Sequence, residues 1–149
     1  MTQTQIRARY GLGIWGLVLV GFSVVFFLGG GAVTYVDDSL RIGIAAVTLG
    51  IGFVGYFSMI YLTREKSKGV SLISDERDID ISRQANEIAL VAMLVFVYVV
   101  CIILFLRYEN LGSLPVGWMW FLAYTNACFG FLAQSAATLI LHRKMNNDG

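Results

Sequence analysis

Residues 74–87 hold the densest group of side chains that could do chemistry, with five acidic residues and two arginines. On a helix, Glu76, Asp80, Arg83 and Glu87 fall at i, i+4, i+7 and i+11 and share one face. Paired carboxylates of this kind could serve acid–base catalysis or hold a divalent cation. The interleaved bases, without a glycine-rich loop or a second ligand cluster, favour surface ion pairs instead. We therefore expect no enzyme, no metal and no cofactor.

The same stripe of charges suits recognition of another molecule. We predict that a helix begins near Ser74, a suitable N-cap with acidic residues in the turn that follows, and continues unbroken into the next apolar run. Its charged face would be a docking surface for a soluble partner or a neighbouring subunit. The predicted partner-binding residues are Asp75, Glu76, Arg77, Asp80, Arg83 and Glu87.

The uncharged run 110–142 carries a second group of polar side chains, which are Tyr124, Thr125, Asn126, Gln134, Ser135 and Thr138. Amide side chains in hydrocarbon need partners, and hydrogen bonds between helices there contribute about 0.6–2 kcal/mol. Three uses are open: contacts within the monomer, which we favour, contacts between monomers, or the lining of a polar cavity. The run contains no Asp, Glu, Lys or Arg, which argues against an ion-coupled transporter.

Small residues form one narrow face of the same run. Ala123, Ala127, Gly130, Gln134 and Ala137 recur at helical spacing, so a second helix could approach closely there. We predict that this helix-packing face contacts the glycine-bearing face of the first or second apolar run. Homodimerisation is the alternative use of the same face.

The remaining reactive residue types are a single histidine and two cysteines. His142 stands beside Arg143 and Lys144 at the end of the last apolar run, where a basic cluster suits anionic lipid head groups. We interpret it as an interfacial anchor rather than a ligand or a catalytic group. Cys101 and Cys128 lie inside apolar runs, and we interpret both as buried small side chains.

The elements that must position these groups are four runs without Asp, Glu, Lys or Arg, at residues 10–36, 42–63, 88–106 and 110–142. About 20 apolar residues cross a hydrocarbon layer of ~30 Å as a helix. The first run is too long for a signal-peptide core, so we expect it to be retained as an anchor. We predict an all-α integral membrane four-helix bundle in one domain, residues 1–149, made of two hairpins. The expected spans are 11–34, 42–62, 86–106 and 116–141, with a cytoplasmic linker over 63–85.

Lysine and arginine are unevenly distributed between the segments outside these runs. The two tails and the linker hold nine of the eleven, and the other two loops hold only Arg41 and Arg107. The positive-inside rule then places both termini and the linker in the cytoplasm. Aromatic residues such as Trp15 and Tyr35 fall near the expected interfaces. A net charge of +1 excludes a strongly basic nucleic-acid face.

The stretch Ser74-Asp75-Glu76-Arg77-Asp78, with Ile81 and then a small residue before an apolar run, carries a resemblance. It resembles the Asp-Glu-Arg signature of a family of small prokaryotic membrane proteins of unknown function, in which two helical hairpins flank the linker. The resemblance extends from the second apolar run to the end of the chain. It implies a multi-pass protein of the prokaryotic cytoplasmic (inner) membrane, with a suspected role in sensing or regulation. It implies no catalytic residue.

Together these features predict a small membrane protein that acts by protein–protein interaction, as a membrane-embedded regulator or accessory subunit. Residues 75–87 would be its docking helix, and its partners would be membrane lipids and either another protein or a second copy of the chain. The alternative is a compact transporter or channel for a small neutral or apolar solute, using Asn126 and Gln134.

Overall fold

The computed structural model describes residues 3–63 and 72–147, and for 72–75 and 146–147 it describes the backbone alone. Within those ranges every element is helical. The four long helices are α1 (Gln3–Leu28), α3 (Ser39–Leu62), α4 (Leu72–Tyr108) and α5 (Gly117–Asn147). The two short ones are α2 (Ala32–Tyr35) and the 3-10 helix η1 (Glu109–Leu111). As expected, α4 continues from the linker into the apolar run without a break, and it begins two residues before Ser74.

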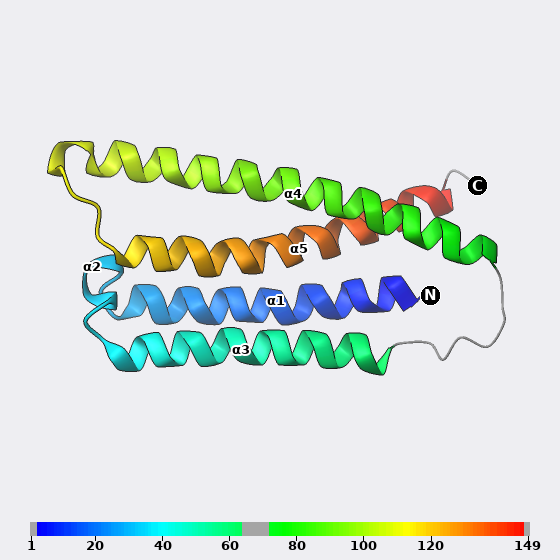
Figure 1. The fold of residues 1–149 in the computed structure, drawn as a ribbon, viewed down its shortest axis with the longest axis horizontal. Helices are drawn as coiled ribbons and strands as arrows, with labels where there is room; N and C mark the ends of the chain where they lie inside the picture. The colour runs from blue at the N-terminus through cyan, green and yellow to red at the C-terminus, as the bar shows by residue number, and fades with distance from the viewer. Residues whose placement is uncertain (1–2, 64–71, 148–149) are drawn as a thin grey trace.

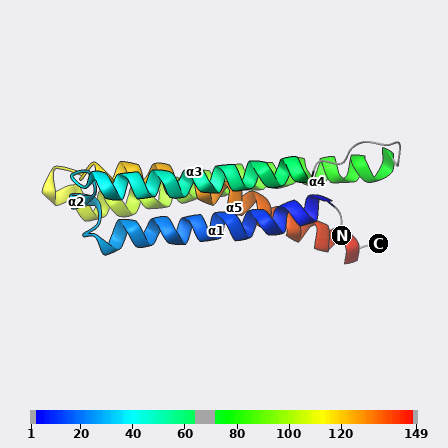
Figure 2. The same cartoon turned by 90° about the horizontal axis from the view of Figure 1, so that it is seen from below.

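The four long helices lie side by side in the order α3, α1, α5, α4 (Figure 1). The layer is curved, since α3 and α4 lie at one level and α1 at another (Figure 2). The extensive contacts join α1 to α3, α1 to α5 and α4 to α5. The described residues therefore form an open layer, with α3 and α4 at its two edges, rather than a closed four-helix bundle. We call the end with both termini the base, and the end with α2 and η1 the top.

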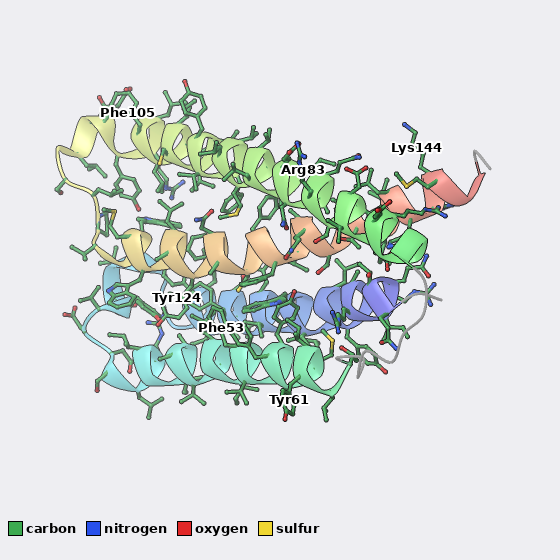
Figure 3. All side chains as sticks on the ribbon, turned by 45° about the vertical axis from the view of Figure 1, so that its right-hand side comes forward. Phe53, Tyr61, Arg83, Phe105, Tyr124 and Lys144 are labelled. Atoms are coloured by element: carbon green, nitrogen blue, oxygen red, sulfur yellow. The ribbon has the colours of Figure 1, made fainter. Side chains whose placement is uncertain are left out.

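Three helical segments are long and apolar enough to cross a membrane: Gln3–Leu28, Ser39–Leu62 and Glu76–Leu111. The fourth expected span, in α5, is not among them, because its polar residues lower its hydropathy. Its position explains this composition, since α1 and α4 cover two of its sides. A helix enclosed by protein needs less apolar surface than one that faces lipid. Large apolar side chains on α3 and α4 point outward instead, as Tyr61 and Phe105 do in Figure 3.

Two glycines end α1 earlier than the expected span 11–34. Gly30 and Gly31 have φ of 101° and 69°, in the left-handed region that residues with a Cβ rarely adopt. The helix therefore stops at Leu28, and α2 follows as a separate turn. The N-terminus of α5 packs on that turn, and Gly117 lies so close to the backbone of Ala32 that a Cβ would overlap it.

Two arginines tie α1 to α3 at opposite ends. At the top, Arg41 is buried and donates hydrogen bonds to the carbonyls of Phe26 (2.6 Å) and Gly29 (2.7 Å) at the end of α1. At the base, Arg7 donates to the hydroxyl (2.8 Å) and the carbonyl (2.7 Å) of Thr63, the C-cap of α3. Helix C-termini carry unpaired carbonyls and partial negative charge, so each guanidinium stabilises the end of the neighbouring helix.

Aromatic side chains fill the space between α1, α3 and α5. Trp15 stacks on Phe131 with 4.4 Å between ring centroids and meets the edge of Phe53 at 5.0 Å. Nearer the top, Phe26 and Tyr35 are fully buried in a second cluster, with 5.1 Å between their ring centroids. Trp15 and Tyr35, which we expect near the membrane interfaces, are thus both buried within the protein. Each is used for packing between helices, where an aromatic ring buries most area.

Candidate functional site

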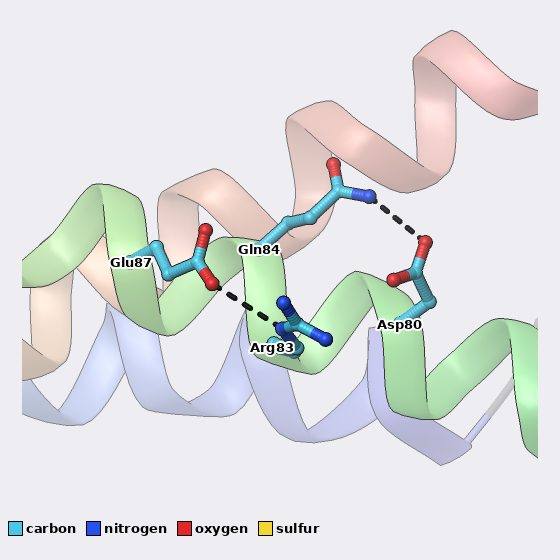
Figure 4. Close-up of polar contacts among 4 residues, drawn as sticks. All are labelled: Asp80, Arg83, Gln84 and Glu87. Atoms are coloured by element: carbon cyan, nitrogen blue, oxygen red, sulfur yellow. Dashed lines mark hydrogen bonds and ion pairs between the residues drawn. The ribbon is translucent and has the colours of Figure 1, made fainter.

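The charged stripe predicted from the sequence lies on the outer face of α4 near the base. The side chains of Glu76, Asp80, Arg83 and Glu87 are all exposed, and we call these four residues the charged stripe. Arg83 pairs with Glu87 at 3.3 Å, and Asp80 accepts a hydrogen bond of 2.8 Å from Gln84 (Figure 4). Both contacts link residues one helical turn apart, so they leave the stripe open to solvent. The other two predicted partner-binding residues differ: Arg77 is exposed beside the stripe, and the side chain of Asp75 lies outside the described residues.

The opposite face of the same half-helix is packed against the protein. Ile81 and Ala85 have no exposed surface, and Ala89 is buried one turn further along. Asp78 is on this inner face and is only partly exposed. The linker helix is thus held by its apolar side while its charged side faces outward.

A polar chamber of about 380 Å³ opens at the base, where all four long helices contribute. Its polar lining residues are Thr4, Arg7, Tyr56, Asp78, Ser82, Gln134, Ser135 and Thr138. Among the described cavities it is the one with charges of both signs, from Arg7 of α1 and Asp78 of α4. Such a mixture of charges and hydroxyls can fix a small polar ligand.

Asp78, on α4, lines this chamber and contacts one residue of α1 and one of α5. Its Oδ2 accepts a hydrogen bond of 2.8 Å from the hydroxyl of Thr4, and its Oδ1 lies 3.8 Å from Nε2 of His142. His142 is 3% exposed, so the expectation of an interfacial anchor is wrong. Burial lowers the pKa of His142 below its ordinary value of 6.5, against the opposing effect of Asp78. The imidazole is therefore neutral at pH 7.

The helix-packing face of α5 meets a different helix from the one expected. A Cβ at Gly130 would lie 2.6 Å from the sulfur of Met93 on α4, and Gln134 donates a hydrogen bond of 2.7 Å to Asn86 on the same helix. The prediction of contact with the first or second apolar run is wrong at these positions, because α5 presents Gly130 and Gln134 to α4. The other members of the face differ in exposure: Ala137 is buried, Ala127 is half-buried and Ala123 is exposed.

The other polar residues of α5 divide between local and buried positions. Thr125 and Thr138 donate to carbonyls one turn earlier in their own helix, at 2.6 and 2.8 Å. Oδ1 of Asn126 is buried and has no hydrogen-bond partner among the described residues. Cys128 is buried as expected, whereas Cys101 is exposed on the outer surface of α4. The expectation for Cys101 fails because α4 is an edge helix with one extensive neighbour.

The sequence did not predict that Arg7, Asp78 and His142 come together. Arg7 and Asp78 line the polar chamber, and His142 lies beside Asp78. A usable signal was present for Asp78, since Ile81, Ala85 and Ala89 follow it at i+3, i+7 and i+11. An apolar stripe at that spacing marks the packed side of a helix. The approach of Arg7 and His142 to that side depends on tertiary packing, which no local pattern encodes.

No family model, no curated protein and no solved structure matches this chain. The resemblance to the family with the Asp-Glu-Arg signature therefore stays a prediction, and the functional argument rests on the geometry of the base.

Proposed function

We propose that this chain is an integral membrane protein that acts by binding another protein, as a regulator or accessory subunit. The charged stripe is its docking surface. One observation carries the proposal: the same half of α4 has a face with no exposed surface at Ile81 and Ala85 and a solvent-facing row of charges. A helix that is already held in place loses little conformational freedom when a partner binds. Charge complementarity would then select the partner and speed its association.

We further propose that the base faces the cytoplasm of a prokaryotic cell. Nine of the eleven Lys and Arg belong by sequence to the tails and the linker, and positive charge favours the cytoplasmic side. The described parts of these segments, at the starts of α1 and α4 and the end of α5, lie at the base (Figure 1). Of the other two, Arg41 is buried as a helix cap, which leaves Arg107 exposed at the top. Large outward apolar side chains on α3 and α4 suit contact with lipid.

The second candidate is a compact transporter or channel for a small neutral or apolar solute. The polar chamber supports a solute site in the described part of the chain. Further from the base, however, the stacked rings of Trp15 and Phe131 and the edge of Phe53 occupy the space between helices. A continuous path would require these rings to move, so the packing favours the docking function.

Photocrosslinking in cells tests the docking function. A photoreactive residue at Asp80 should give a discrete adduct, whereas one at the exposed Asn110, at the top, should not. With the photoreactive residue kept at position 80, the double variant Glu76→Lys with Glu87→Lys should abolish the adduct without changing expression, because exposed helix pairs contribute about 0.2–0.5 kcal/mol to stability.

The matched control carries the same change of charge at the top, with Asp37→Lys and Glu109→Lys, both exposed. It should leave the adduct at Asp80 intact. An adduct of a second copy of the chain would make the partner a homo-oligomer. Equal adducts at both positions, or an adduct that survives charge reversal in the stripe, would exclude docking through this surface.

A further inference from the structure

The polar chamber brings a cation and an anion from distant parts of the chain to one cavity. Arg7 lies in α1 and Asp78 in α4, and the chamber volume of about 380 Å³ lies in the range of small-molecule sites. Hydroxyl groups of Ser82 and Ser135 line the same space. The chamber therefore offers more polar chemistry than packing between apolar helices requires.

Both charges keep capacity for a ligand. Arg7 uses Nε and Nη2 for Thr63, and its Nη1 makes no hydrogen bond with any described residue. Asp78 accepts from Thr4 through one oxygen, and the other faces His142 at 3.8 Å. Because burial lowers the pKa of His142, the neutral imidazole does not neutralise the carboxylate.

The pair of charges decides the chemistry of the ligand. An anion alone would be attracted by Arg7 and repelled by Asp78. A cation alone would be attracted by Asp78 and repelled by Arg7. A molecule that carries both charges satisfies both groups, and the partly desolvated walls strengthen the discrimination. We propose that the polar chamber binds a small zwitterion, with its acidic group against Arg7 and its protonated amine against Asp78. This site is independent of the docking surface.

Two sources supply this chemistry. One is a free α-amino acid, and the other is the head group of phosphatidylethanolamine, which joins an ammonium group to a phosphate. Phosphatidylcholine provides a control for the second source, since its trimethylammonium group has no N–H to donate to Asp78.

The first experiment uses the full chain purified in detergent. Its melting temperature is measured with each standard L-amino acid at millimolar concentration, and Kd is then determined by calorimetry for those that raise it. Analogues of the best binder that lack one of the two charged groups should bind about tenfold more weakly or worse. For L-alanine these are propionate, which lacks the amine, and ethylamine, which lacks the carboxylate. The second experiment compares the melting temperature in nanodiscs of phosphatidylethanolamine and of phosphatidylcholine.

Three variants separate binding from folding. Asp78→Asn removes the anion and Ser82→Leu fills the chamber, so either should abolish the ligand effect. Arg41→Gln removes a helix cap at the top, far from the chamber, and should lower stability while leaving Kd unchanged. A response to amino acids that Ser82→Leu abolishes supports the free ligand, and a preference for phosphatidylethanolamine that it abolishes supports the lipid. The absence of both responses, or their persistence in Asp78→Asn and Ser82→Leu, would overturn the proposal.

Discussion

Arg7 and Arg41 cap each other's helices. Arg7, in the second turn of α1, donates to Thr63 at the end of α3, and Arg41, in the first turn of α3, donates to Phe26 and Gly29 at the end of α1. The exchange is possible because α1 and α3 are adjacent and antiparallel, so the start of each lies beside the end of the other. Each arginine thereby satisfies carbonyls that a helix end leaves unpaired.

Loss of the cap at the top should be costly. Arg41→Gln removes the charged donor from the buried carbonyl of Phe26, and we expect the free energy of unfolding to fall by about 2–4 kcal/mol. Denaturant titration in detergent measures the change. Arg107→Gln provides the control, since Arg107 is exposed at the same end and should change stability by less than about 0.5 kcal/mol. Equal losses in the two variants would show that the cap is not stabilising.

The contact between Gly117 and the backbone of Ala32 should tolerate no side chain. Gly117→Ala places a Cβ where the carbonyl of Ala32 lies, and backbone cannot move aside as a flexible side chain can. We expect a loss of about 1–3 kcal/mol. Gly13→Ala is the matched control, because nothing lies within 4 Å of its Cβ position, and it should gain up to about 1 kcal/mol from better helix propensity. A lower melting temperature for Gly13→Ala than for Gly117→Ala would contradict this geometry.

At Gly130, the size of the substituent should matter. Gly130→Ala is expected to cost little, because the contact is with the flexible end of Met93. Gly130→Leu should cost about 1–3 kcal/mol through overpacking, and Met93→Ala should recover part of that loss in the double variant. Phe129→Leu serves as a control on the neighbouring face. Additive effects of Gly130→Leu and Met93→Ala would show that α4 and α5 do not meet there.

His142 should make the protein less stable in mild acid. Its pKa is lowered in the folded state, so stability is fully present above about pH 6.5 and is lost as pH falls below it, when the unfolded chain takes up a proton more readily. In His142→Gln, the melting temperature should change less between pH 8 and 5.5 than it does in the unmodified protein. Asp78→Asn should steepen the loss, because Asp78 holds the pKa up against burial. A wild-type melting temperature that rises on acidification would reverse the assigned shift.

Orientation can be tested by labelling single cysteines in a background without Cys101 and Cys128. Lys144→Cys, exposed at the base, should react with an impermeant maleimide only from the cytoplasmic side, and Ser113→Cys, exposed near the top, only from outside. Labelling of Lys144→Cys in intact cells would show that the base and the charged stripe face away from the cytoplasm.

The long helices were predictable because the uncharged runs that define them are uninterrupted. The end of α1 was harder, since its helix stops at Leu28 where Gly30 and Gly31 adopt positive φ, although the apolar run continues. Hydropathy reports burial away from water, and it does not distinguish a residue in lipid from one between helices. That is why the expectation that Cys101 is buried between helices is wrong.

The partly predicted site shows the same limit. The spacing of Glu76, Asp80, Arg83 and Glu87 was enough to assign them to one exposed face, because i and i+4 positions are local. The neighbour of Gly130 was not predictable, since a small residue permits close approach by any helix and specifies none. Asp78 meets Thr4 across 74 positions of sequence, a distance over which periodicity carries no information.

The place of α5 in the layer has a consequence for biosynthesis. α5 follows α1, α3 and α4 in the sequence and is therefore made after them, yet it lies between α1 and α4 and supplies the main contact of α4 with the other described helices. Until it is made, α4 has no extensive partner among the described helices, and the face of α1 that packs against α5 is uncovered. The packing of α4 on these helices therefore waits until α5 has been made. A stop codon near Gly117 would release α1, α3 and α4 without the helix that joins α4 to α1, and we expect a quality-control protease to recognise that intermediate.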